Sequence, residues 1–131
     1  QNNGKSWNRI YNELNQLSDV NVTALAALDS VLFAGTLEGI LKSTDFGIHW
    51  VKLDSGLTDH LISALHADGK HLYAGTRRGV FRLNEDGTYW KSLGLSHLEI
   101  TAIAANDSFL LVGANGFPEF GKVFSLERTK E

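Results

Sequence analysis

The sequence predicts an all-β fold built from a unit of about 40 residues that occurs three times. The first observation is a regular offset: the segment from Val22 aligns with the segment from Ile62, 40 residues later, and a third copy begins at Ile100, 38 residues after that. The second is that every copy consists of short apolar runs bounded by turn residues. Glycine and tryptophan keep their spacing in the first two copies, where Gly35, Gly39, Gly47 and Trp50 correspond to Gly75, Gly79, Gly87 and Trp90.

Each unit divides into four strand-like runs. The first alternates small and apolar residues, as in VTALAAL, ISALHA and ITAIAA, and the second is almost continuously apolar, as in VLFAGT, HLYAGT and FLLVGA. The third follows a glycine turn, as in GILKS, GVFRL and GKVFSL, and the fourth opens at a tryptophan, as in WVKL, WKSL and WNRI. A helix is expected only at residues 10–17, between units. Four short strands per unit are typical of the blades of a β-propeller.

The third unit lacks its fourth run, whereas a spare one stands at the N-terminus. The units cover about residues 22–53, 62–93 and 100–128, and residues 6–10 supply the run that completes the third. Three blades alone would leave two apolar faces open, which soluble monomers avoid. We therefore expect residues 1–131 to form one propeller-type domain of three four-stranded repeats, and a homodimer with strand exchange at the termini to make six blades. Nine blades from three copies, or an open arc cut from a longer chain, are the alternatives.

Composition excludes several classes of protein. The 131 residues suffice for one domain, and 12 Lys and Arg against 15 Asp and Glu, with no basic run beyond Arg77 and Arg78, argue against a nucleic-acid partner. No apolar run is long enough for membrane insertion. The lack of cysteine excludes disulfides and thiolate metal sites. The chain starts at Gln1 and has no methionine, and a removed signal peptide is one explanation, which favours an extracellular or periplasmic location.

The segment STDFGIHW at residues 43–50 resembles the Asp-box, or BNR, repeat of sialidases, xyloglucanases, sortilin-like receptors and photosystem II assembly factors. It matches that pattern completely: Ser or Thr, any residue, Asp, any residue, Gly, two of any residue, Trp. The segments LNEDGTYW and NNGKSW keep only the glycine and the tryptophan. Residues 55–83 are also similar to the propeller repeats of two-component regulators. The resemblance implies these structural positions: Ser43, Asp45, Gly47, Trp50, Glu85, Gly87, Trp90, Asn2, Gly4 and Trp7.

Physical chemistry explains why such a segment holds a turn. A short hairpin loop needs a glycine where φ is positive, and an aspartate just before it accepts backbone N–H groups. The tryptophan ring then packs between neighbouring blades, and its N–H needs one partner. We therefore expect Asp45 and Trp50 to be structural.

No catalytic arrangement is recognisable. A sialidase would need an arginine triad, but the chain has only five arginines and none forms the expected motif at the first strand. A xyloglucanase-type pair of aspartates needs a cleft between two propellers. The five histidines, His49, His60, His66, His71 and His97, have no metal-ligand spacing. The prediction is a non-enzyme without metal or cofactor, and the alternative is a fragment of a glycoside-hydrolase-like enzyme or of a sensor domain.

What remains is a binding surface. In a propeller, the turns between the second and third strands share one face with the connections between blades, and irregular loops there carry function. The loop ANGFPEFG departs most from the repeat, with two phenylalanines and the only proline. A protein or peptide ligand ranks first and a carbohydrate second, since arginines and aromatic rings suit either. Solvated charges, or an ion pair between Arg78 and Glu38, are the alternatives. The candidate contacts are Arg77, Arg78, Glu38, His60, His97, Phe117 and Glu119.

Overall fold

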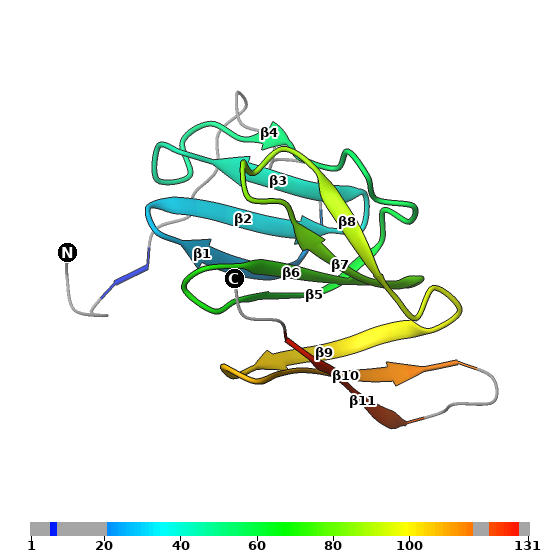
Figure 1. The fold of residues 1–131 in the computed structure, drawn as a ribbon. Coiled ribbons are helices and arrows are strands. Elements are labelled where there is room, and N and C mark those ends of the chain that lie inside the picture. Colours follow the sequence, from blue (N-terminus) through cyan, green and yellow to red (C-terminus); the bar gives the residue numbers. More distant parts are fainter. Residues whose placement is uncertain (1–5, 8–20, 117–120, 129–131) are drawn as a thin grey trace.

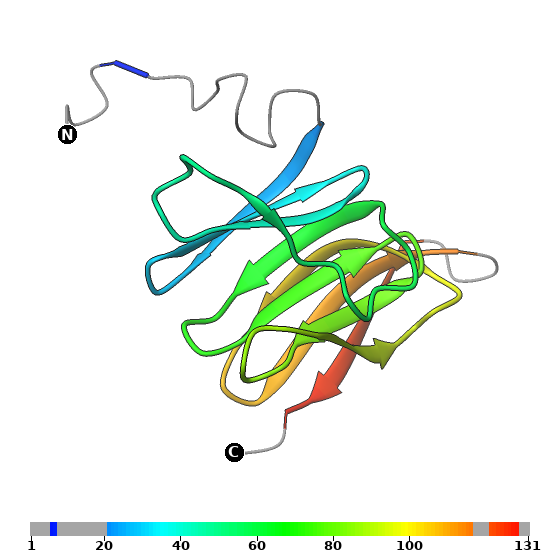
Figure 2. The same cartoon turned by 90° about the horizontal axis from the view of Figure 1, so that it is seen from above.

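The computed structural model describes residues 6–7, 21–116 and 121–128, and its strands pair in antiparallel fashion. They form three sheets that lie side by side in chain order, with the first and third at opposite ends of the stack (Figure 1 and Figure 2). No helix occurs among the described residues, so none there is long and apolar enough to cross a membrane. The all-β prediction is confirmed. The helix expected at residues 10–17 lies outside the described residues.

Sheets 1 and 2 each have four strands in the order of the chain. Sheet 1 contains β1 (Val22–Leu28), β2 (Val31–Thr36), β3 (Gly39–Ser43) and β4 (Val51–Lys52). Sheet 2 contains β5 (Ile62–Ala67), β6 (Leu72–Thr76), β7 (Gly79–Leu83) and β8 (Trp90–Gly94). The strands coincide with the runs that the repeat predicts.

Sheet 3 differs because it has three strands within the described part of the chain. These are β9 (Glu99–Ala105), β10 (Phe109–Asn115) and β11 (Lys122–Glu127), in the order β11-β10-β9. Of residues 6–10, the run expected to supply a fourth strand, the structure describes Ser6 and Trp7. Within the described residues, β11 is therefore an edge strand that pairs with β10 alone.

The turn between the second and third strands is built alike in sheets 1 and 2. The Thr36 hydroxyl donates to the Gly39 carbonyl at 2.8 Å, and the Thr76 hydroxyl donates to the Gly79 carbonyl at 3.0 Å. Each hydroxyl also accepts the N–H of the residue two positions later. Both glycines have positive φ, which other residues adopt at a cost. Two exposed residues project from each turn, and in sheet 2 they are Arg77 and Arg78.

Alternate side chains of each strand fill the spaces between neighbouring sheets. Trp90, on β8, is fully buried in the cluster between sheets 1 and 2. That cluster contains Phe33, Ile40, Leu53, Leu57, Ile62, Leu72, Ala74, Phe81, Leu83 and Trp90. The cluster between sheets 2 and 3 contains Tyr73, Val80, Leu98, Ile100, Leu110, Val112 and Ala114.

Close approach of the sheets depends on two glycines. A Cβ atom at Gly35 would lie 2.5 Å from Ile62 Cγ2, and one at Gly75 would lie 2.6 Å from Ile100 Cγ2. In each case a β-branched side chain at the start of the next sheet occupies the space that glycine leaves. The repeated glycine of the second run is therefore a packing requirement, which explains its recurrence at a constant offset.

Candidate functional site

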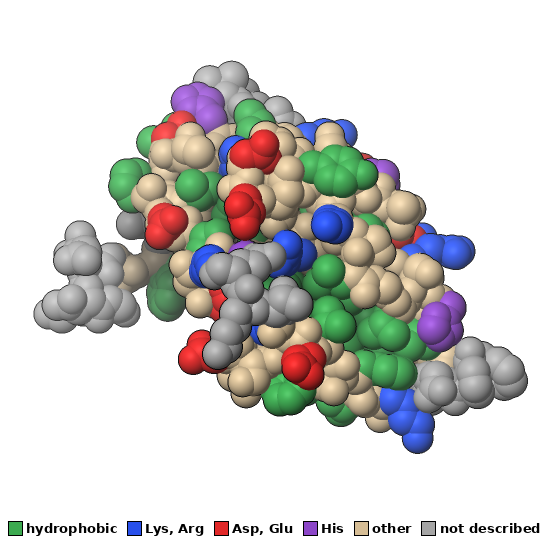
Figure 3. Space-filling model, viewed as in Figure 1, with side chains coloured by type: hydrophobic (Ala, Val, Ile, Leu, Met, Phe, Trp, Pro, Cys, Tyr) green, Lys and Arg blue, Asp and Glu red, His purple; other side chains and the backbone are tan. Residues whose placement is uncertain are grey.

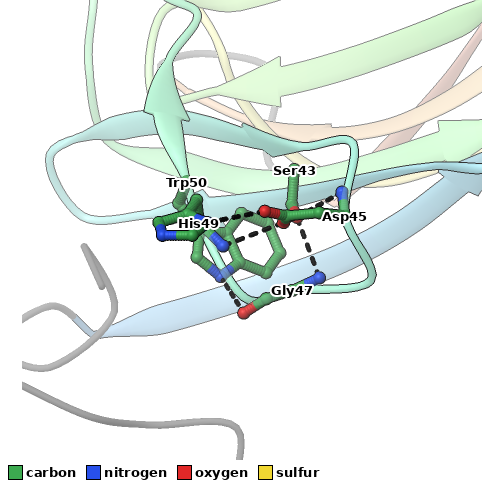
Figure 4. Close-up of polar contacts among 5 residues, drawn as sticks. All are labelled: Ser43, Asp45, Gly47, His49 and Trp50. Carbon is green, nitrogen blue, oxygen red and sulfur yellow. Dashed lines mark hydrogen bonds and ion pairs between the residues drawn. The ribbon is translucent and has the colours of Figure 1, made fainter. Parts of the chain in front are cut away.

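The turn at residues 43–50 joins β3 to β4 and is closed by its own polar groups (Figure 4). The buried Ser43 hydroxyl donates to Asp45 Oδ1 at 2.9 Å and accepts the Gly47 N–H at 2.8 Å. Asp45 accepts the His49 N–H at 2.9 Å, and its other oxygen lies 2.7 Å from His49 Nδ1. The Trp50 indole N–H donates to the Gly47 carbonyl at 2.9 Å. These contacts bind the turn to itself.

Serine, aspartate and histidine meet in this turn, but in the wrong order for nucleophilic catalysis. A serine nucleophile needs an imidazole between its hydroxyl and the carboxylate. Here the carboxylate of Asp45 lies between Ser43 and His49. The backbone N–H of His49, followed by its ring, holds the pKa of Asp45 at about 2, below the usual 3.8. Asp45 is thus a charged hydrogen-bond acceptor that stabilises the turn. Within residues 43–50, the His49 imidazole contacts Asp45 and not the Ser43 hydroxyl, so it does not act on Ser43 as a general base.

The corresponding turn at residues 83–90, in sheet 2, is closed by a different acceptor. Asn84 Oδ1 accepts the N–H groups of Thr88 and Tyr89 at 2.9 and 3.0 Å. Glu85, which aligns with Asp45 in the sequence, is exposed. Asparagine readily accepts backbone N–H groups a few residues further on, so its presence one position earlier was the available signal. Trp90 then donates its indole N–H to the Leu53 carbonyl of the preceding sheet at 2.7 Å.

A second group of polar side chains lies near the turn between β6 and β7, which carries Arg77 and Arg78. Its centre is Asp59, in the connection between β4 and β5, whose side chain is buried. Asp59 Oδ1 accepts the Leu61 N–H at 2.9 Å. Asp59 Oδ2 accepts from Arg77 Nε and Nη2 at 3.2 and 3.1 Å, and Arg78 Nε lies 3.7 Å from the same oxygen.

These partners keep Asp59 ionised. Burial raises the pKa of Asp59, but the N–H of Leu61 and the guanidinium groups of Arg77 and Arg78 outweigh it, so the pKa lies below the usual value. The carboxylate in turn holds the guanidinium group of Arg77 by hydrogen bonds and attracts that of Arg78 as an ion pair, and both groups are well exposed. The sequence allows an ion pair between Arg78 and Glu38 as an alternative, whereas in the structure Arg78 Nε lies 3.7 Å from Asp59 Oδ2.

A further pair lies beside the turn between β2 and β3. Asp54 Oδ2 is 3.7 Å from His60 Nε2, and both side chains lie within 4 Å of the position that a Cβ atom at Gly39 would take. Glu38, the neighbour of Gly39, is exposed there. Three loops thus meet: the turn β2–β3, the connection β4–β5 and the turn β6–β7. We call this the loop face and define it by Glu38, Asp54, Asp59, His60, Arg77 and Arg78.

The loop face includes four of the seven contacts expected from the sequence. His97 is exposed in the connection between β8 and β9, without a described contact to the group. Phe117 and Glu119 lie outside the described residues, as do Asn2 and Gly4 of the N-terminal segment. No sequence pattern marks Asp54, because carboxylates in connections are common. Among the described residues, no three His, Asp or Glu side chains are grouped to hold a metal ion.

The charge of the loop face is mixed. Three carboxylates oppose two guanidinium groups, which leaves one net negative charge when His60 is neutral. A simple anion site is therefore not expected. Donors and acceptors alternate over a short distance, an arrangement suited to a polar ligand that offers both.

A cavity of about 640 Å³ lies elsewhere. It is lined by the turns β1–β2 and β5–β6 and by residues 83–87, at the other end of the strands. Its lining mixes Lys42, Lys70, Glu85 and Asp86 with aliphatic side chains. The cavity and the loop face are thus separate features, and only the loop face has a buried charge that positions exposed ones.

No protein-family model matches the chain, and no curated protein matches it. Among solved structures, it is similar to the extracellular domain of BT4673 from B. thetaiotaomicron. One such structure, described as part of a hybrid two-component system, gives a TM-score of 0.66 at 19% identity over 83% of this chain and 17% of that one. Another, described as part of a one-component system, gives 0.64 at 18% identity over 79% and 16%. At these identities the likeness concerns the fold, and this chain spans under a fifth of those chains.

Proposed function

We propose that this chain is a non-catalytic binding module of β-propeller type, with Asp-box turns, whose ligand contacts the loop face. The observation that carries the proposal is the buried carboxylate of Asp59, which holds two exposed guanidinium groups where three loops meet. Ser43, Asp45 and His49 are engaged in closing their turn, which supports a role without catalysis.

Fixed donors favour binding because less side-chain entropy is lost when a ligand arrives. Each guanidinium has five N–H donors, so contacts to Asp59 leave Arg77 and Arg78 with several N–H groups for a ligand. Glu38 and His60 add exposed groups on the adjoining loops. This combination suits a peptide, which offers amide donors and carbonyl acceptors in turn.

A protein or peptide ranks above a carbohydrate on this surface. Sugar rings commonly stack on aromatic side chains, and within the described part of the loop face no aromatic ring other than His60 is present. A second candidate, that the chain is a segment of an extracellular sensor domain, is favoured by the likeness to BT4673. The same likeness to extracellular domains favours an extracellular or periplasmic location.

The test is a binding screen with two panels, one of peptides and one of neutral and acidic oligosaccharides. We expect saturable binding to members of the peptide panel and at least a tenfold loss of affinity in Arg78→Ala. Lys91→Ala, which removes an exposed lysine on β8, is the matched control and should bind normally. Absence of binding to both panels would contradict the proposal, as would release of a product from any oligosaccharide.

A further inference from the structure

An apolar cavity of about 160 Å³ opens between sheets 2 and 3. Hydrophobic side chains gather on this face of the molecule over the region between β8 and β11 (Figure 3). Engineered apolar cavities of about 150 Å³ take up benzene, so this one has room for an aromatic ring. The lining includes Val80, Leu93, Leu110, Val112, Phe124 and Leu126.

Between sheets 1 and 2 the corresponding space is filled by Trp90. The repeat offset and the strand register relate six of the lining residues to residues of the cluster that buries Trp90: Val80 to Ile40, Leu93 to Leu53, Leu110 to Leu72, Val112 to Ala74, Phe124 to Phe81 and Leu126 to Leu83. The exposure of the equivalents differs accordingly. Leu83 is 7% exposed beside Trp90, whereas Leu126 is 46% exposed. The cavity thus corresponds in position to the space that Trp90 fills between sheets 1 and 2.

The far face of sheet 3 shows a second unmatched feature. Gly113 repeats Gly35 and Gly75, yet a Cβ atom there would meet only atoms of β9, at 3.1 Å or more, and no β-branched side chain of a further sheet. The residue that repeats Ile62 and Ile100 is Val22, which is exposed at the start of sheet 1. One end of the stack thus has the recess, and the other end has a side chain of the type that fills it.

Hydrogen bonds from side-chain hydroxyls link neighbouring sheets in the same repeating way. Thr23 donates to the Ile62 carbonyl at 2.6 Å, and Ser63 donates to the Ile100 carbonyl, so each sheet is tied to the next. Thr101 holds the equivalent position on sheet 3, and its side chain is exposed. Its expected acceptor is the carbonyl of Val22.

We propose that Trp7 of a second copy of this chain fills the cavity between sheets 2 and 3. Sheet 1 of the second copy then packs on sheet 3, with its Val22 over Gly113. Trp7 is 91% exposed, which leaves its ring available. By analogy with Trp90, its indole N–H donates to the Leu93 carbonyl. The contact occurs twice in a pair and closes a ring of six sheets.

The order of the chain favours a second copy over the same one. Trp50 precedes β5 and Trp90 precedes β9, so each tryptophan belongs to the sheet just before the next first strand. Trp7 precedes β1 and belongs to a sheet on the open side of sheet 1. Sheet 3 of the same chain lies at the opposite end of the stack (Figure 2).

The first test is the dissociation constant of the pair, measured by sedimentation over a range of concentrations. Trp7→Ala removes an exposed ring and should raise that constant at least about a hundredfold while the chain stays folded. Leu126→Arg places a charged side chain in the lining of the cavity and should also raise the dissociation constant at least about a hundredfold. An equimolar mixture of the two variants retains one intact contact and should associate more tightly than either variant alone. A folded wild-type monomer at every concentration would overturn the proposal.

The second test is a disulfide between copies. Residues 1–131 include no cysteine, so Val22→Cys with Thr101→Cys introduces the only pair in this sequence. Because these positions lie at opposite ends of the stack, a bond within one chain is geometrically excluded. On oxidation we expect a covalent species of twice the mass, and the control pair Val22→Cys with Lys91→Cys should give little. Failure of the first pair to exceed the control would overturn the proposal.

Discussion

The contacts between sheets 1 and 2 and those between sheets 2 and 3 use the same repeat positions but are completed differently. Trp90 seals the first, with its ring fully buried and its N–H on the Leu53 carbonyl. The contact between sheets 2 and 3 is bridged by Arg128, which follows β11. Arg128 pairs with Asp68 of sheet 2 and lies 5.8 Å from the ring centroid of Tyr73 on β6. The apolar repeat positions therefore determine where two sheets pack together. The tryptophan of the fourth strand determines whether the space between them is filled.

The largest effect should come from Trp90→Ala, which unseals the first contact. Loss of a buried tryptophan costs about 3–5 kcal/mol, and the Leu53 carbonyl loses its partner. We expect the free energy of unfolding in urea to fall by that amount. Trp7→Ala, at a concentration where the chain is monomeric, is the control and should change it by less than about 0.5 kcal/mol. Equal effects of the two variants would contradict the comparison.

The second contact should depend on its ion pair. The Asp68 and Arg128 side chains are mostly buried, and Asp68 also accepts the N–H groups of Lys70 and His71. Arg128→Met keeps the aliphatic stem and should lower the free energy of unfolding by about 1.5–3 kcal/mol. Lys91→Met, at an exposed lysine, should be neutral. Coupling energy near zero in a double-mutant cycle with Asp68→Asn would show that the pair does not join the sheets.

The two turns 43–50 and 83–90 offer a smaller contrast. In the second turn Asn84 accepts two backbone N–H groups, whereas Glu85 is exposed. Asn84→Ala should cost about 1 kcal/mol of unfolding free energy, and Glu85→Ala should stay within about 0.5 kcal/mol. A larger loss for Glu85→Ala would mean that the aligned position, and not the asparagine, closes the turn.

The smallest effect concerns the titration of Asp45. Its folded-state pKa of about 2 lies below the usual 3.8, so the folded state binds fewer protons than the unfolded state between these values. The contribution of Asp45 to stability is present above about pH 4 and is lost as the pH falls through 2. His49→Ala should raise this pKa only in part, because the backbone N–H of residue 49 remains. Carboxyl NMR titration measures it, and an unshifted wild-type pKa would contradict the assignment.

The sequence predicts what repeats and misses what does not. The strands follow from the recurring glycines, since Gly35 and Gly75 must make room for Ile62 and Ile100 at each sheet contact. No period marks Asp59 as the shared partner of Arg77 and Arg78, because charged residues in connections have no spacing rule. For the same reason the pair of Asp68 with Arg128, 60 residues apart, could not be predicted.

In our proposal, a second copy of the chain completes the contact between sheets 2 and 3. Light scattering after size exclusion, at several concentrations, tests it most directly. We expect a species of twice the chain mass of 14.4 kDa for the wild type and of one chain mass for Trp7→Ala. A compact wild-type species of one chain mass at all concentrations would contradict it.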